Sequence, residues 1–493
     1  MNLAEISPRF RPTPTRIAFI GSLALSLMAW ATSTINRDGM LYVDTARIFL
    51  EQGFLAAKAN FSWPFISILI AAFSKLTGLP LEAAGYLMNA LFMAGATAFL
   101  VAAACRNSPQ AAWAICLVAL AMPGINEYRN ELLREFGCWF FIMAAFWLAQ
   151  RWAEQPRWTS GLLAQGLIGL ATLFRPEAAA MVPALLAWQL FAAPHGERRR
   201  RLLMIGGGAV AGLLALLLLH FSGWLGSERL AAEVSRVNIA RFNAKAEAIS
   251  TTFIEYARGQ ARTILFFGSL ALIPVKLLNK LGLLLLPLLA LLFVPNRPSL
   301  RDALRQHSLH AWGFAAQIVV LAVFVLDLQF LAGRYVGLLL LFTTPFFGLA
   351  IWQLMQCFPR WRDAITAALL LIMLASTFSL SGGKPQFLEA GQWLTHNASP
   401  SARTFVGSGR SAYYAGWGYK EAQASPTTLT EAVREGRYDL YIVEVRRDDN
   451  TVRDWIQRSG LVVVRRFANR HSDEVVVLSP NAGKLKKEAP SAK

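Results

Sequence analysis

The chain has 493 residues, of which 55% are hydrophobic and only 16% are charged, and its formal net charge is +18. This composition excludes an ordinary soluble protein, in which apolar and charged residues are more evenly balanced. The basic residues stand mostly at the ends of apolar blocks, a pattern that is typical of membrane topology and not of a nucleic-acid-binding surface.

Apolar blocks near the roughly 20-residue length of a spanning helix recur along the chain. The first follows Arg9, Arg11 and Arg16 and has no small-residue cleavage site after it, so we expect an uncleaved helix. The pattern predicts a polytopic α-helical membrane protein with about 11 transmembrane helices. The predicted spans are 17–35, 81–104, 111–125, 137–153, 160–174, 177–193, 202–221, 277–294, 309–326, 336–355 and 363–380.

The run 64–79 decides the orientation of everything after it. At about 1.5 Å per residue it reaches only ~24 Å, short of a ~30 Å hydrocarbon core. Read as an interfacial helix, it leaves the arginine-rich loops, including 198–201, on the side of the N-terminus, as the positive-inside rule requires. We therefore expect a cytoplasmic N-terminus and an extracytoplasmic C-terminal region. Pro274 and Lys280 leave a second interfacial helix open within 264–294.

The polar region after residue 380 is predicted to be a small extracytoplasmic α/β domain over 381–480. Apolar strand patterns alternate there with helical stretches at 388–396 and 449–458. The predicted strands are TFVGSG, YDLYIVEV, LVVVRRFA and EVVVLSP. Residues 481–493 are basic and are predicted to be a disordered tail. Residues 1–380 are predicted to form a transmembrane domain, with interfacial helices at about 38–79.

Ionisable groups beside the hydrocarbon are costly, so a cluster of them at one membrane face indicates function. Asp38 directly follows the first span, and Tyr42 lies four residues on, on the same helical face. A carboxylate here can accept a proton or hold a divalent cation. The structural alternative is an N-cap or interfacial aspartate. Asp44, with Arg47 and Glu51, has the spacing of surface ion pairs, which favours a structural role.

The second predicted outer loop contains a dense group of charges. Glu127, Glu131 and Glu135 fall four apart, as on one helical stripe, with Arg129 and Arg134 beside them. Arginine binds phosphate through a planar fork of donors. We therefore take Arg129, Glu131, Arg134 and Glu135 as substrate-binding candidates, with a solvated loop and a simple Glu131–Arg134 pair as the alternative.

Two further arginines stand at predicted outer helix ends. Arg175 precedes Glu177 after the fifth span, and Arg334 precedes Tyr335 before a late span. Binding of a substrate phosphate and anchoring to lipid headgroups are both open for Arg175 and for the Arg334–Tyr335 pair.

Seven motifs follow one another along the chain: RDGMLYVDTARIFLEQGF, FSWPFISILIAAFSKLTGL, LLREFG, LFRPEA, GRYVGLLLLFTTPF, EAGQWLTHNASPSARTFVG and SAYYAG. In this order they resemble the GT-C superfamily of polyprenyl-phosphate-sugar-dependent transferases. The resemblance is strongest to the bacterial branch that groups RgtA/B/C/D-like enzymes with the aminoarabinose transferase of lipid A and the protein O-mannosyltransferases. It covers most of the membrane region and implies the GT-C fold.

The resemblance also implies residue roles. Asp38 matches the catalytic carboxylate of the family, and Arg134 with Glu135 matches an arginine-acid pair implicated in donor binding. Many members have Asp-Glu where this chain has Asp38-Gly39, so one acidic group is missing. Metal dependence therefore stays open, with Asp38 and Glu135 as candidate ligands of a divalent cation and Glu135 or Asp44 as a replacement acid.

The implied reaction is sugar transfer in the cell envelope. An acceptor hydroxyl, deprotonated by Asp38, attacks the anomeric carbon of a sugar on a polyprenyl phosphate, and the lipid phosphate leaves with inversion. The expected partners are this donor, a lipid, polysaccharide or protein acceptor, and membrane lipids, without nucleic acid. The expected location is the bacterial inner membrane, with a periplasmic C-terminal domain.

Two other classes remain as alternatives. A transporter or lipid flippase is expected to show internal repeats and charges at the membrane midplane, and the sequence shows neither. An O-antigen polymerase or ligase is expected to place its key arginines in a large late loop. The loop 223–262 keeps that alternative open, since it carries Arg229, Arg236, Arg241 and Arg258.

Overall fold

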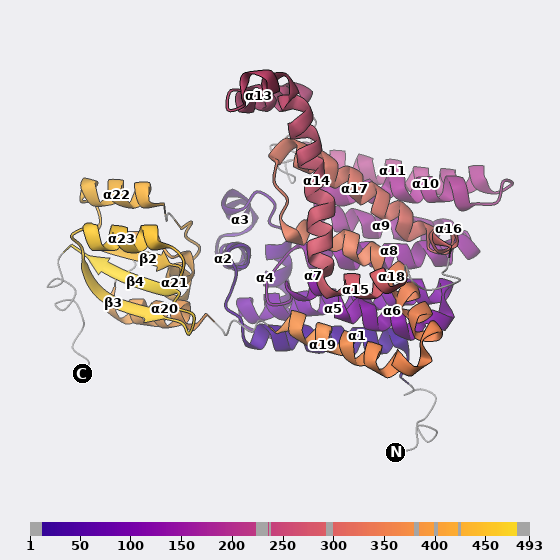
Figure 1. Cartoon of the computed structure of the whole chain (residues 1–493), viewed down its shortest axis with the longest axis horizontal. Helices are drawn as coiled ribbons and strands as arrows, with labels where there is room; N and C mark the ends of the chain where they lie inside the picture. The colour runs from indigo at the N-terminus through magenta and orange to yellow at the C-terminus, as the bar shows by residue number, and fades with distance from the viewer. Residues whose placement is uncertain are drawn as a thin grey trace, which may run out of the picture. The chain divides into compact units, whose positions relative to one another are not determined.

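The computed structural model describes residues 12–222, 235, 238–291, 299–378, 384–398, 403–422 and 425–480. These residues form a mainly helical protein with one small sheet near the C-terminus (Figure 1). Among the described residues, five helical stretches are long and apolar enough to cross a membrane: Pro14–Ala31, Leu81–Asn107, Glu255–Pro287, Ser308–Leu328 and Gly333–Cys357. The predicted fold class is confirmed, and the number of spans stays a prediction.

The helices follow the predicted apolar blocks closely. In chain order they are α1 (Pro14–Ala31), α2 (Arg37–Gln52), α3 (Phe54–Asn60), α4 (Phe65–Thr77), α5 (Leu81–Asn107), α6 (Ala112–Ala121), α7 (Pro123–Asn126), α8 (Glu135–Glu154), α9 (Trp158–Phe174), α10 (Met181–Ala192), α11 (Arg198–Phe221), α13 (Ile239–Ser250), α14 (Ala261–Leu281), α15 (Leu285–Leu291), α16 (Leu300–Gln306), α17 (Ser308–Leu328), α18 (Gly337–Cys357) and α19 (Arg362–Thr377). Short 3₁₀ segments include η4 (Pro176–Ala180) and η7 (Gly333–Val336).

Two details of the predicted helices are wrong. The span predicted at 277–294 is divided, because α14 ends at Leu281 and α15 begins at Leu285; the C-cap Gly282 has a φ of 52°, which favours glycine, and residues 292–294 lie outside the described residues. The stripe predicted through Glu127, Glu131 and Glu135 does not exist, since residues 127–134 form turns. The backbone of Leu132 in these turns bonds to the Asn36 side chain instead of continuing a helix.

Helix α4 bears on the predicted topology. Its 13 residues are apolar and reach about 20 Å at the rise of an α-helix. This is less than the roughly 30 Å of a hydrocarbon core, so the length of α4 fits an interfacial helix. The sidedness of the chain stays a prediction.

The chain divides into two compact units. The first comprises Met1–Leu27, Leu87–Arg129 and Arg134–Phe378, and the second comprises Met28–Tyr86, Asn130–Leu133 and Ser379–Lys493. Helices α2 to α4 therefore belong to the same unit as the C-terminal sheet, whereas α6 to α19 belong to the first unit.

Small residues let the helices of the first unit approach one another. A Cβ atom at Gly137 of α8 would overlap the ring of Phe174 at the end of α9, and one at Gly337 of α18 would overlap the ring of Trp139 of α8. Such close approach is how helices pack in membranes, where apolar surface alone gives little drive for association. These contacts bring the first turn of α8 beside the ends of α9 and η7.

The C-terminal part of the second unit is an α/β layer structure. Its strands β1 (Thr404–Gly407), β2 (Leu440–Val445), β3 (Val462–Ala468) and β4 (Glu474–Ser479) lie where the sequence predicted them, in the order β1-β2-β4-β3. β1 pairs with β2 in parallel, and the other two pairings are antiparallel. Figure 1 shows α22 (Pro426–Glu435) and α23 (Asn450–Arg458) on one face and α20 (Pro385–Asn397) on the other.

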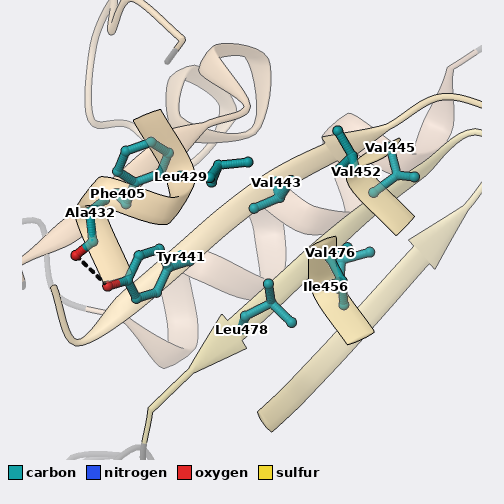
Figure 2. Close-up of a cluster of buried hydrophobic side chains, with 10 residues drawn as sticks. All are labelled: Phe405, Leu429, Ala432, Tyr441, Val443, Val445, Val452, Ile456, Val476 and Leu478. Carbon is teal, nitrogen blue, oxygen red and sulfur yellow. Dashed lines mark hydrogen bonds between the residues drawn. The ribbon is translucent and has the colours of Figure 1, made fainter. Parts of the chain in front are cut away.

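Strands β2 and β4 are buried on both faces, whereas the edge strand β3 is mostly exposed. Tyr441 and Val443 point toward α22 and α23, as Figure 2 shows, and the Tyr441 hydroxyl donates to the Ala432 carbonyl at 3.1 Å. Leu440 and Ile442 pack on the opposite side with α20. A strand covered on both faces has a continuous apolar sequence, which explains the pattern LYIV.

Candidate active site

The ends of α8 and α9 bring two buried charges together. Arg175, which follows α9, donates from Nη1 to Oε1 of Glu135, the first residue of α8, at 2.8 Å. Its Nε donates to Glu177 Oε1 at 2.5 Å. Glu135 and Arg175 are both buried. Arg175 therefore bridges two carboxylates, and although burial opposes its charge, Glu177 and Glu135 hold the pKa of its guanidinium above the usual arginine value.

The turn η7 adds a second arginine and an aromatic ring. Arg334 Nε lies 3.4 Å from Glu135 Oε1. The Tyr335 ring lies 4.6 Å from the Arg175 guanidinium carbon and 5.6 Å from that of Arg334, within the range of a cation–π contact. The motifs LLREFG, LFRPEA and GRYV, which are far apart in the sequence, therefore meet at one place.

This cluster has spare hydrogen-bonding capacity. Arg134 Nη1 and Glu135 Oε2 are buried and have no hydrogen-bond partner among the described residues. Buried polar atoms without partners are costly, and such atoms at a cavity wall are suited to a polar ligand. The cluster holds three guanidinium groups, on Arg134, Arg175 and Arg334, against two carboxylates. Because the cluster has one more positive than negative charge, it is suited to an anionic ligand.

The cluster lies at the wall of a cavity of about 680 Å³. The remaining wall is mainly apolar and comes from α8, α10, α17 and α18. The lining residues are Arg134, Glu135, Cys138, Trp139, Arg175, Pro176, Glu177, Ala178, Ala180, Pro183, Ala184, Ala187, Trp312, Ala315, Ala316, Gln317, Val319, Val320, Leu321, Val323, Phe324, Arg334, Tyr335 and Leu338. A cationic cluster joined to an apolar cavity is suited to an amphiphile with an anionic headgroup.

Lys280, which was not among the predicted site residues, packs against η7. Lys280, near the end of α14, forms an ion pair with Glu127 and lies 5.2 Å from the centre of the Tyr128 ring. A Cβ atom at Gly333 would lie 2.8 Å from Lys280 Nζ, so this lysine contacts the turn that carries Arg334. The only signal of Lys280 in the sequence is that it interrupts an apolar block.

Asp38 belongs to the second unit and lies in the first turn of α2, half-buried. The N-cap of α2 is Asn36, so the N-cap interpretation of Asp38 is wrong. A carboxylate in the first turn is still favoured by the helix dipole. Tyr42 lies one turn on, buried, with its ring 5.6 Å from that of Phe61. The structural role predicted for Asp44 is confirmed by its ion pair with Arg47.

The position after Asp38 has no room for a side chain. A Cβ atom at Gly39 would lie 2.6 Å from Asn36 Oδ1 and 3.0 Å from Leu132 Cβ. Asn36 is itself fixed, because its Oδ1 accepts the Leu132 N–H at 3.0 Å. Many members of the superfamily have a glutamate at the position of Gly39. In this chain a glutamate there would displace the Asn36 side chain from its hydrogen bond with Leu132, which gives a steric reason for the glycine.

The remaining candidates of the second loop have different surroundings. Arg129 is buried and donates to Ser22, Ser26 and Asn126 at 2.8 to 3.0 Å. Burial lowers the pKa of its guanidinium to about 9. These contacts join α1 to α7, and Arg129 does not line the cavity described above. Glu131 is half-buried and belongs to the second unit.

No group of three histidine, cysteine or acidic side chains that could hold a metal ion comes together in the part of the chain that the structure describes. The candidate metal ligands Asp38 and Glu135 belong to different units. Of the loop arginines, Arg229 and Arg236 lie outside the described residues, and Arg241 lies 3.4 Å from Asp327, an ion pair at the end of α17.

Comparison with known proteins gives one family match and a set of similar folds. Residues 61–225 match the family model described as dolichyl-phosphate-mannose-protein mannosyltransferase. No curated protein matches the sequence.

Two solved structures each match more than nine tenths of this chain. ArnT from Cupriavidus metallidurans, bound to undecaprenyl phosphate, is 12% identical with a TM-score of 0.57, and the match covers 95% of this chain and 98% of that chain. The oligosaccharyltransferase of Archaeoglobus fulgidus, tethered with an acceptor peptide, is 10% identical with a TM-score of 0.49, over 94% of this chain and 74% of that chain.

Proposed function

We propose that the chain is a GT-C glycosyltransferase that transfers a sugar from a polyprenyl-phosphate donor, a proposal supported by the family match of residues 61–225 and by the likeness in fold to ArnT. The acceptor is a lipid, a polysaccharide or a protein. The reaction takes place at the periplasmic face of the bacterial inner membrane, where a donor anchored in the bilayer can reach the site.

The observation that carries this proposal is the cavity with arginines in its wall. Arg134, Arg175 and Arg334 lie at one cavity whose other walls are mainly apolar. A polyprenyl phosphate is divided in the same way, because its charged phosphate suits the arginines and its apolar tail suits the rest of the cavity wall. Undecaprenyl phosphate, to which ArnT is bound in its structure, is of this chemical class.

Asp38 is the proposed general base. Its carboxylate takes the proton of the acceptor hydroxyl, and the hydroxyl oxygen forms a bond to the anomeric carbon. The bond between that carbon and the phosphate oxygen breaks at the same time, and its electron pair leaves with the lipid phosphate. Attack opposite to the leaving group inverts the anomeric configuration.

The arginines stabilise the leaving phosphate. Negative charge grows on the bridging oxygen as its bond to the sugar breaks, and guanidinium groups already fixed in place stabilise that charge without reorganisation. Arg175 is fixed in this sense, because Glu135 and Glu177 hold it from two sides. A phosphate is a good leaving group, so one carboxylate suffices, unlike the two that a glycosidase needs.

The test is a transfer assay in nanodiscs with a panel of polyprenyl-phosphate sugars. Mass spectrometry of envelope glycolipids and glycoproteins, with and without the gene, selects the donor and acceptor. Asp38→Asn should then lower turnover by about 10²-fold to 10⁴-fold, the range for a general base. Glu51→Gln, an exposed carboxylate on the same helix, is the matched control and should keep normal turnover. Near-normal turnover in a folded Asp38→Asn protein would contradict the role of Asp38.

A further inference from the structure

One segment of the C-terminal domain contacts the residues on both sides of Asp38. This segment, 409–421, consists of α21 (Gly409–Tyr414) and the turn after it, and it belongs to the same compact unit as α2. The Tyr414 hydroxyl accepts the Ile35 N–H at 2.9 Å. Arg37 Nε donates to the Tyr419 hydroxyl at 3.4 Å, and Arg37 also forms an ion pair with Glu421.

The bond to Ile35 is the important one of these contacts. Ile35 is fully buried and precedes the N-cap of α2, so its N–H lies outside the hydrogen-bond ladder of the helix. A buried N–H needs a partner, and the Tyr414 hydroxyl provides it. The Arg37 contacts are exposed to solvent and add little by themselves. Tyr414 therefore fixes the point at which the chain turns into α2, three residues before Asp38.

The C-terminal domain holds Tyr414 firmly. Ala415 packs in the buried cluster formed by α20 and the sheet. A Cβ atom at Gly391 of α20 would lie 2.9 Å from the Tyr414 carbonyl carbon, so α21 rests directly on α20. The position of Tyr414 is therefore tied to the core of the domain and not to a free loop.

The later part of the segment, around Gly418, also contacts α2. Gly418 has a φ of 73°. A Cβ atom there would lie 2.7 Å from Arg47 Nη2 and 2.9 Å from Asp44 Oδ1. The backbone conformation favours glycine at this position, and a side chain there would displace the end of Arg47 or of Asp44. The segment thus contacts α2 before its first turn and again beyond Asp38.

We propose that segment 409–421 is a positioning clamp for Asp38 and that Tyr414 is its positioning residue. The clamp gives the C-terminal domain a part in catalysis, because it sets where the Asp38 carboxylate stands relative to an acceptor hydroxyl. This inference rests on the proposed function, in which Asp38 is the general base. A shift of about 1 Å in a catalytic group can cost on the order of 10²-fold in rate.

The test removes one hydroxyl group. Tyr414→Phe should lower kcat by about 10-fold to 10²-fold, with the KM for the donor and the Tm nearly unchanged. Hydrogen exchange of a peptide that covers residues 33–41 should become faster, because the Ile35 N–H loses its acceptor. Tyr441→Phe is the matched control, since the Tyr441 hydroxyl donates to the Ala432 carbonyl at 3.1 Å and lies in the same domain but outside segment 409–421. That variant should keep the kcat of the wild type.

A double variant separates positioning from general stability. If Tyr414 acts through Asp38, adding Tyr414→Phe to Asp38→Asn should lower kcat no further, whereas independent effects would multiply. Should Tyr414→Phe also lower the Tm, Gly418→Ala becomes the second test, because it moves the other end of the clamp. A kcat equal to that of the wild type in a folded Gly418→Ala protein would overturn the inference.

The outcomes for the clamp and for the proposed function are distinct. An inactive Asp38→Asn protein together with a fully active Tyr414→Phe protein would overturn the clamp and keep the proposed function. A wild type that transfers no sugar from any donor would contradict the proposed function. In that case the exchange of residues 33–41 decides, and unchanged protection in Tyr414→Phe would overturn the clamp as well.

Discussion

Replacing Arg175 by methionine would separate the structural and the binding roles of the cavity cluster. Methionine has a similar length but neither charge nor donors. Its introduction leaves Glu135, whose side chain is 5% exposed, without the bond of 2.8 Å to Arg175. Breaking a buried pair by removing one partner costs about 3–5 kcal/mol, because the other charge stays buried. For a chain of 493 residues this corresponds to a fall in Tm of roughly 3–5 °C.

The second variant adds Glu135→Gln to Arg175→Met. The amide removes one of the two carboxylates that Arg175 holds, so we expect part of the lost Tm to return, while Glu177 still lacks its bond to Arg175. Sugar transfer should not return, because the phosphate still lacks the Arg175 guanidinium. The expected loss of kcat/KM is about 10-fold to 10²-fold, in keeping with a charged hydrogen bond worth about 1.5–3 kcal/mol.

The assays are thermal unfolding in detergent and donor-dependent transfer in nanodiscs, measured on the same preparations. Arg106→Met is a suitable control, since Arg106 forms a surface ion pair with Glu154 that should contribute little to stability. An unchanged Tm in Arg175→Met would refute the buried bridge. Full transfer by the double variant would refute phosphate binding by Arg175.

Four other outcomes can be measured. Arg134→Ala should raise the donor KM and slow turnover, and Arg134→Lys should restore only part of the loss, since lysine has charge without the planar fork; equal recovery would contradict this. Lys280→Met should lower transfer by about 10-fold, because η7 loses a support for Arg334, and normal kinetics would count against it. Gly39→Glu should lower the Tm, because position 39 has no room for a side chain; an unchanged Tm would show that the turn adapts. Alkaline phosphatase should be active when fused after Ala390 and inactive after Arg201, and the reverse would overturn the predicted topology.

The sequence alone determined the elements that depend on local patterns. A block of apolar residues forms a helix in a membrane because its backbone groups bond within the segment, so α5, α17 and α18 lie at their predicted places. Strands β2 and β4 of the C-terminal domain followed from the same kind of signal, since two buried faces give a continuous apolar run. The order of the charged motifs indicated the superfamily, although each motif by itself is short.

Only the tertiary structure decided which charged residues meet. Arg129 and Arg134 stand five positions apart and looked equivalent in the sequence, yet Arg129 joins α1 to α7 whereas Arg134 lines the cavity. The spacing along a chain shows which side chains can share a face, but it does not show which face another helix covers. Glu135, Arg175 and Arg334 have no local signal for one another, because their contacts depend on the close packing of α8 with α9 and α18. For the same reason no pattern around Tyr414 could indicate its bond to Ile35, a residue at the other end of the chain.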